Sequence, residues 1–106
     1  RFPGGSINSY NTAVYKDIKA EMIRRGFVPY DWNVSSGDAS TTKYTPEQLT
    51  GHVLNGIGSK SRIIVLMHDS SSKENTAQAV RQIITGIRDK GFTFAPLNYQ
   101  TKPILF

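Results

Sequence analysis

The stretch that decides the fold is Arg62-Ile63-Ile64-Val65-Leu66-Met67-His68-Asp69. Its apolar run, residues 63–67, has the length of a strand and is too short for a helix of ordinary size. A strand with one solvated face would alternate apolar and polar residues, so this unbroken run predicts burial on both faces, as in a parallel sheet. His68 and Asp69 come directly after the run, where the strand should end and a loop begin.

Three amphipathic helices surround this strand in the sequence. The first is expected over residues 9–25, because Ala13, Val14, Ile18, Met22 and Ile23 recur at helical spacing, and Gly26 would end it. The other two begin with capping-box patterns: a helix from Thr45 to about residue 56, and a helix from Ser71 to about residue 90. Their inward-facing residues are expected to be Leu49, Val53, Leu54 and Ile57 in the former, and Ala77, Val80, Ile83, Ile84 and Ile87 in the latter.

Two further strands are expected at residues 27–30 and 92–95, and residues 33–42 read as a loop rich in Ser, Gly, Asp and Thr. Helices that alternate with strands indicate right-handed crossovers and a parallel sheet, so the fold class is α/β. Three strands cannot close a barrel. An open sheet edge exposes unpaired backbone groups, which favours a missing partner that covers it.

The expected strand ends bring polar residues to one rim. Asp31 and Trp32 follow the strand at residues 27–30, His68 follows the next strand, and Arg1 precedes the turn residues Pro3-Gly4-Gly5. Reactive groups of β/α folds gather at the carboxyl ends of strands. Histidine is suited to general acid catalysis near neutral pH, a neighbouring carboxylate such as Asp31 would orient its ring, and a glycine-rich backbone can bring an N–H to an oxyanion. This combination suits amide hydrolysis.

The motifs Arg1-Phe2-Pro3-Gly4-Gly5, Asp31-Trp32 and Leu66-Met67-His68 resemble, in this order, the last three motifs of the NodB-type polysaccharide deacetylases (carbohydrate esterase family 4). The resemblance implies that residues 1–106 form the C-terminal half of a distorted β/α barrel whose metal-binding half lies upstream. It also implies a role for each matching residue. His68 is the general acid, Asp31 tunes it, Arg1 pairs with a catalytic base, Gly4 donates its backbone N–H to the oxyanion, and Trp32 and Leu66 line the acetyl pocket.

The same resemblance implies a hydrolase that removes N-acetyl groups from peptidoglycan or a chitin-like glycan at the cell wall or outside the cell. Its divalent metal, zinc or a similar ion, would bind upstream residues. The chain has no cysteine and only two histidines, His52 and His68, so it cannot supply the family's Asp-His-His triad. We therefore expect no metal site in these residues, no activity from them alone, and association with an N-terminal fragment or self-association.

Net charge and hydropathy limit the kinds of partner and the rival functions that the sequence allows. The net charge is +5, but the basic residues are scattered and no nucleic-acid motif appears, so we expect no nucleic-acid partner. No apolar run approaches the length of roughly 20 residues that a membrane helix needs. One rival function is a non-catalytic carbohydrate-binding module of the same fold, and another is a basic interaction domain for nucleic acid or other anions.

Several residues also have purely structural interpretations. Asp31 could be a turn residue, Trp32 a core residue and His52 a surface or packing residue. The Ser36-Gly37-Asp38 segment reads first as a turn, with substrate contact as the alternative.

Overall fold

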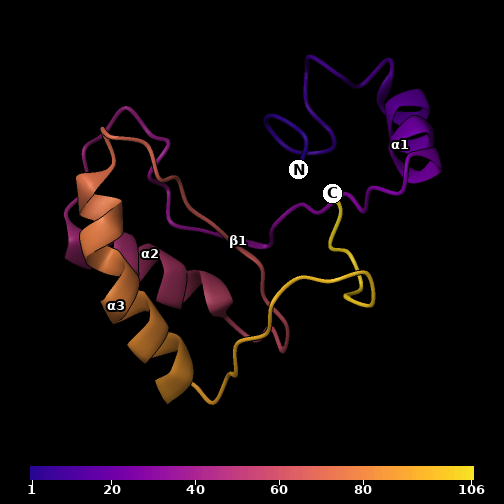
Figure 1. Ribbon diagram of the computed structural model, residues 1–106. Coiled ribbons are helices and arrows are strands. Elements are labelled where there is room, and N and C mark those ends of the chain that lie inside the picture. Colours follow the sequence, from indigo (N-terminus) through magenta and orange to yellow (C-terminus); the bar gives the residue numbers. More distant parts are fainter. The chain divides into compact units, whose positions relative to one another are not determined.

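The computed structural model describes residues 1–106 and divides them into two compact units. We call residues 1–32 with 96–106 the terminal unit, and residues 33–95 the central unit. The element order is α1 (Tyr15–Arg24), β1 (Val34–Ser35), α2 (Pro46–Ile57), β2 (Val65–Leu66) and α3 (Glu74–Asp89) (Figure 1). No helix of the structure is long and apolar enough to cross a bilayer.

The central unit is a two-layer α/β arrangement. Its sheet has two short parallel strands in which Val34 pairs with Val65 and Ser35 pairs with Leu66. Helices α2 and α3 lie side by side and pack on each other (Figure 1). The α/β class and the parallel sheet expected from the sequence are therefore present, although one of the two strands, β1, is not a strand that the sequence predicts. These two strands form an open sheet and no barrel.

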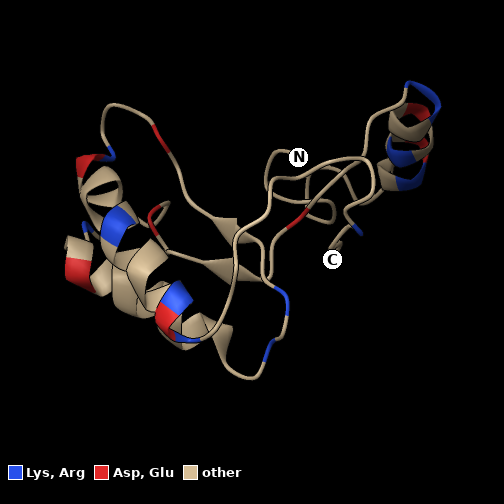
Figure 2. Cartoon of the chain, turned by 60° about the horizontal axis from the view of Figure 1, so that its bottom comes forward, with Lys and Arg blue, Asp and Glu red and all other residues tan.

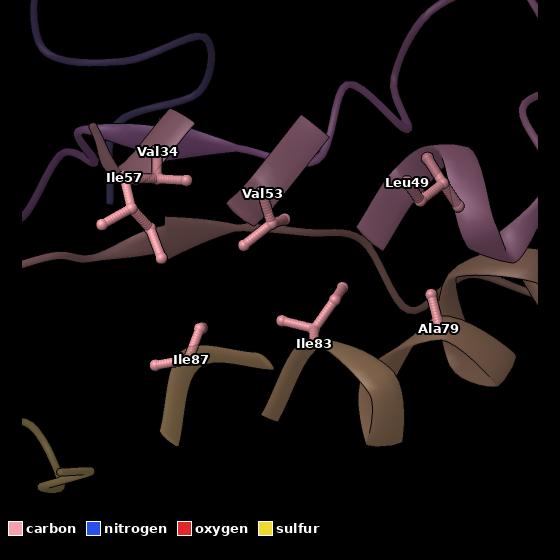
Figure 3. Close-up of a cluster of buried hydrophobic side chains, with 7 residues drawn as sticks. All are labelled: Val34, Leu49, Val53, Ile57, Ala79, Ile83 and Ile87. Atoms are coloured by element: carbon pink, nitrogen blue, oxygen red, sulfur yellow. The ribbon is translucent and has the colours of Figure 1, made fainter. Parts of the chain in front are cut away.

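Seven buried apolar residues form the core of the central unit. Figure 3 shows the residues of β1 and α2 facing those of α3 across the layer between them. Deep burial of aliphatic side chains is the main favourable contribution to folding, so this cluster holds the central unit together. Its members are Val34, Leu49, Val53, Ile57, Ala79, Ile83 and Ile87.

Helix α2 begins and ends close to the expected positions. The side chain of Thr45 accepts a hydrogen bond from the Gln48 N–H at 3.2 Å, and the Gln48 Oε1 accepts one from the Thr45 N–H at 3.0 Å. These two bonds are the predicted capping box, and Pro46 occupies the first helical position, where a missing N–H does no harm. Of the expected inward residues, Leu49, Val53 and Ile57 are buried, and Leu54 packs against the core from its edge.

Helix α3 departs from the expectation at its start. The capping box predicted between Ser71 and Glu74 is wrong: the helix starts at Glu74, and its N-cap residue, Lys73, makes no side-chain cap. The Lys73 N–H donates instead to the Ser70 carbonyl at 2.8 Å, so a turn occupies the expected first residues of the helix. The stripe is also rotated, because Thr76 and Ala79 are buried while Ala77 is exposed. Gly86 lets the two helices approach, since a Cβ built there would lie 2.6 Å from Leu54 Cδ1.

The strands differ most from the sequence-based expectation. The strand β1 lies inside the stretch predicted to be a loop, and β2 is shorter than the predicted strand. The Asn33 side chain accepts from the Ile64 N–H at 2.8 Å and donates to the Arg62 carbonyl at 2.9 Å, so an amide side chain adds to the backbone bonds that the Ile64 carbonyl accepts there. Burial of the apolar run on both faces is also wrong, because all of residues 63–68 are only partly buried.

The expected strands at residues 27–30 and 92–95 are wrong as well, because neither segment pairs with a neighbouring strand. Pro29 cannot donate to a ladder, in keeping with this outcome. In the terminal unit, the Tyr30 hydroxyl donates to the Asn98 and Thr101 carbonyls at 2.9 and 3.0 Å, which ties this segment to residues near the end of the chain.

Helix α1 starts at Tyr15, six residues later than predicted. The preceding residues fold back on Asn8, whose side-chain oxygen accepts from the Tyr10 N–H at 2.8 Å and the Asn11 N–H at 3.2 Å. Such local side-chain bonds compete with helical ones. The helix buries no residue within its unit, and Ile18 and Ile23 are 37% and 56% exposed. Lys, Arg and acidic residues intermingle along it (Figure 2).

Candidate functional site

The two parallel strands of the central unit bring a histidine and an aspartate together. The chain leaves β1 at Ser35 and β2 at Leu66, and these residues pair across the sheet. Because parallel strands end at the same edge, the residues that follow them become neighbours there. The residues so placed are Asp38, in the loop after β1, and His68, just after β2.

Asp38 and His68 make two hydrogen bonds. The His68 Nδ1 lies 2.8 Å from Asp38 Oδ1, and the His68 backbone N–H donates to Asp38 Oδ2, also at 2.8 Å. Nδ1 therefore carries a proton, which leaves Nε2 as the ring nitrogen able to exchange a proton with a ligand. The carboxylate is nearly enclosed, with 3% of its side chain exposed, whereas the imidazole is 32% exposed. The geometry is that of an oriented histidine with one accessible nitrogen.

Further hydrogen bonds fix the Asp38 carboxylate and its backbone. The Thr76 hydroxyl donates to Oδ2 at 3.0 Å, the Asp38 N–H donates to Ser36 Oγ, and the Lys73 ammonium donates to the Asp38 carbonyl. Burial by itself would raise the pKa of Asp38, but the hydrogen bonds from His68, Thr76 and Ser36 outweigh it and hold the pKa below its usual range. Asp38 is therefore an anion near neutral pH.

The loop that carries Asp38 is supported from α2. The Nδ1 of His52 donates to the Ser36 carbonyl at 2.8 Å, and its ring meets the Tyr44 ring edge-on with centroids 4.6 Å apart. Asn75 donates to the Tyr44 carbonyl at 2.8 Å. His52 is therefore an exposed residue that also packs against Tyr44, in keeping with the surface or packing role expected from the sequence.

A polar cavity of about 320 Å³ adjoins this aspartate. It lies between the loop after Asp38 and the first turn of α3, and hydroxyl groups dominate its wall. Such a lining suits a ligand rich in hydroxyls more than an apolar one. The lining residues include Ser40, Thr41, Thr42, Tyr44, Ser71 and Ser72.

Asp31, the carboxylate expected from the sequence to orient His68, belongs to the terminal unit. Its side chain is 2% exposed and accepts from the Ser6 N–H at 2.7 Å, the Ser6 hydroxyl and the Phe106 N–H at 2.8 Å. These contacts satisfy the carboxylate and organise the terminal unit. The structure thus gives Asp31 a structural role there, and gives the Nδ1 of His68 a different carboxylate.

The remaining residues predicted from the motifs are divided between the two units. Leu66 lies in β2 of the central unit and is half-buried. In the terminal unit, the Arg1 guanidinium lies 5.6 Å from the centroid of the Trp32 ring, and that ring meets Phe106 edge-on at 4.8 Å. Gly4 has φ +71° within a turn closed by the Gly5 N–H and the Phe2 carbonyl. This positive φ favours glycine, and the turn leaves the Gly4 N–H without an intramolecular acceptor.

Sequence reasoning missed Asp38 as the partner of His68. The signal was present but weak, since an aspartate follows the single apolar residue Val34 by four positions. Val34 is 3% exposed, which marks β1 in the structure, but one apolar residue among Asn, Ser and Gly does not predict a strand. Without β1, the rim position of Asp38 could not be predicted.

No group of three or more His, Asp or Glu side chains converges in the structure in a way that could hold a metal ion, and the chain has no cysteine. Asp38 and His68 form a pair, and their close neighbours Thr76 and Lys73 are not carboxylates or imidazoles. The residues present therefore do not fit the divalent metal that the resemblance implies.

The chain is similar to deacetylases of known sequence and structure. A bifunctional xylanase/deacetylase from Pseudobutyrivibrio xylanivorans is 32% identical over 90 residues, which are 85% of this chain and 13% of that protein. The crystal structure of the catalytic domain of a peptidoglycan N-acetylglucosamine deacetylase from Eubacterium rectale matches all of this chain with a TM-score of 0.90 and 35% identity. This chain is related to the NodB-type polysaccharide deacetylases. The resemblance stated from its motifs is thereby confirmed.

A CE4 esterase from Streptococcus mutans matches 76% of this chain with a TM-score of 0.66 and 29% identity. The chain spans 49% of the Eubacterium rectale domain and 36% of the Streptococcus mutans chain. No family model matches it. The α/β units described above thus correspond to a part of the CE4 deacetylase fold, and the family is one of hydrolases.

Proposed function

We propose that residues 1–106 are part of a polysaccharide deacetylase that hydrolyses N-acetyl groups of N-acetylglucosamine in peptidoglycan or a related glycan. The observation that carries the proposal is the pair formed by His68 Nδ1 and Asp38 Oδ1 at 2.8 Å, in a chain related to deacetylases. Amide hydrolysis needs an acid that protonates the departing amine, and an oriented imidazole with a free nitrogen can be that acid.

In this proposal each residue has one task. His68 donates the proton on Nε2 to the leaving nitrogen of the sugar. Asp38, rather than Asp31, holds the ring in the orientation that directs Nε2 outward. The family resemblance assigns Leu66 and Trp32 to the lining of the acetyl pocket, and assigns the Gly4 N–H to the developing oxyanion.

The metal, the partners and the location of the protein belong to the same proposal. A divalent ion, zinc or a similar one, would supply a Lewis acid, and it would be held by residues other than 1–106, as would the base that pairs with Arg1. We therefore propose that residues 1–106 are inactive alone, that they associate with an N-terminal segment of the same protein or with each other, and that the enzyme acts at the cell wall or outside the cell.

The test compares two aspartates in the protein that carries residues 1–106. We expect His68→Ala to lower kcat for acetate release from N-acetylglucosamine oligomers by about 10²–10⁴-fold, the usual contribution of general acid catalysis. Asp38→Asn should lower kcat as well, and the exposed Asp89→Asn is the matched control. A His68→Ala protein with unchanged kcat, or an Asp31→Asn protein that loses kcat without loss of folding while Asp38→Asn keeps it, would contradict the assignment.

The second candidate, a non-catalytic carbohydrate-binding module, rests on the hydroxyl-lined cavity beside Asp38. It predicts glycan binding without acetate release, unchanged by a chelator. Chelator-sensitive acetate release by the intact protein would exclude it, and release by residues 1–106 alone would contradict the proposed need for other segments.

A further inference from the structure

The hydroxyl of Thr76 contacts the carboxylate that orients His68. Thr76 is the third residue of α3, is 4% exposed, and donates from Oγ1 to Asp38 Oδ2 at 3.0 Å. Two neighbouring side chains, Lys73 and Asn75, also reach the loop after β1, but they bond the backbone carbonyls of Asp38 and Tyr44. Of the three, only Thr76 touches the carboxylate itself.

The two carboxylate oxygens of Asp38 have different partners. Oδ1 faces His68 Nδ1, while Oδ2 accepts from the His68 backbone N–H and from Thr76. Rotation of the carboxylate about its Cβ–Cγ bond would break these contacts together, so a second donor on Oδ2 strengthens the one orientation that faces the imidazole. Hydrogen bonds to an ionised group are stronger than those between neutral groups, so the contribution of Thr76 is not negligible.

We propose that Thr76 is a positioning residue of the deacetylation reaction: its hydroxyl holds the Asp38 carboxylate in the plane that orients His68. The inference rests on the proposed function for the identity of the reaction, but not for the contact itself. A residue that served only to fill space would be replaced by valine without loss, because valine has nearly the shape of threonine and lacks only the hydroxyl.

Three variants of the intact protein separate these roles. Thr76→Val removes the hydroxyl, and Thr76→Ser keeps it. Thr50→Val is the matched control, because the Thr50 hydroxyl donates to the Pro46 carbonyl within α2, away from Asp38. We expect Thr76→Val to lower kcat roughly tenfold with KM little changed, and Thr76→Ser to restore most of it, whereas Thr50→Val leaves kcat unchanged.

A second readout does not depend on activity. The chemical shift of the Asp38 carboxyl carbon is followed by NMR as the pH falls. The titratable groups near Asp38 are His68 and Lys73, which bond to it, and His52, which bonds to the Ser36 carbonyl. Because the Thr76 hydroxyl bonds the charged form of Asp38, its removal should move the Asp38 titration to higher pH, and Thr76→Ser should return it.

The outcomes are distinct. An Asp38 titration that is the same in wild type and Thr76→Val overturns the inference, as does a kcat for Thr76→Val equal to that of Thr50→Val in an active enzyme. If the protein proves to have no deacetylase activity, the proposed function fails while the titration still decides the contact. If Thr76→Val does not fold, the wild-type Thr76 resonances serve instead: they should shift with the Asp38 titration, and their failure to do so overturns the inference.

Discussion

The contacts that stabilise the inside of each unit differ between the two units: apolar packing in the central unit and hydrogen bonds to a buried carboxylate in the terminal unit. The central unit has seven buried apolar residues packed between two helices and a strand. The terminal unit has two buried apolar side chains, Phe2 and Pro29, and a buried Asp31 carboxylate surrounded by donors. Apolar burial has no direction, whereas each hydrogen bond needs a partner at a given place. Order that depends on apolar burial can therefore be predicted from the periodicity of the sequence, whereas order that depends on individual hydrogen bonds cannot.

The largest expected effect is in the apolar core. Ile83 is 2% exposed between α2 and α3, so Ile83→Ala should lower the free energy of unfolding by about 2–5 kcal/mol through lost burial and the cavity left behind. Ile23 of α1 is 56% exposed, and Ile23→Ala should change it by about 0.5 kcal/mol or less. Denaturant unfolding followed by circular dichroism measures both. If Ile23→Ala lowers the free energy of unfolding as much as Ile83→Ala does, α1 is buried in the folded protein.

A smaller effect is expected in the terminal unit. Asp31→Ala leaves the Ser6 N–H, the Ser6 hydroxyl and the Phe106 N–H without their acceptor, which should destabilise that unit by about 1–3 kcal/mol. Hydrogen exchange should speed up at the Ser6 and Phe106 amides and stay unchanged at Val53. The control is Asp17→Ala in α1, whose carboxylate is exposed. If Ser6 and Phe106 stay protected in Asp31→Ala, the polar network is not what orders this unit.

The smallest effect concerns pH and the one buried anion of the central unit. The pKa of Asp38 is held below its ordinary value of 3.8 in the folded protein, so the unfolded state binds the proton more readily. The stability that Asp38 contributes is therefore complete above about pH 4 and is lost as pH falls through its lower folded pKa. In Asp38→Asn this dependence should vanish. Unfolding curves of both proteins between pH 2.5 and 6, a range chosen to bracket the ordinary pKa, should converge towards the acid end; parallel curves would contradict the cause assigned to the shift.

Much of the central unit could be predicted from the sequence. The capping box at Thr45 and the helical spacing of Leu49, Val53 and Ile57 are local signals, and the structure has the helix within a residue or two of its expected ends. The strand β1 could not be predicted, because Val34 alone is apolar and its pairing with Val65 bridges thirty-one positions. In the terminal unit, the hydrogen bonds of the Asn8 side chain make the residues before Tyr15 form turns, so α1 starts later than its apolar periodicity predicts.

The candidate site could be predicted only where it depends on a local apolar signal. His68 stood at the end of a strand with a clear apolar signal, so its position at a strand end followed from the sequence. Its partner depended on β1, and Asp31 was chosen because it followed a strand that does not form. Asp38 lay in a segment read as a turn, although its burial and its contact with α3 set it apart in the structure.

The close approach of α3 to α2 at Gly86 bears on how this protein could be made more robust. Replacing a helical glycine with alanine is a common way to stabilise a protein, worth up to about 1 kcal/mol. Gly51 in α2 has open space around its missing side chain and obeys that rule. At Gly86 the same methyl group would meet Leu54 Cδ1 at 2.6 Å and Cγ at 3.2 Å. The whole Leu54 side chain would have to move, so an engineer guided by helix propensity alone would choose well at one glycine and badly at the other.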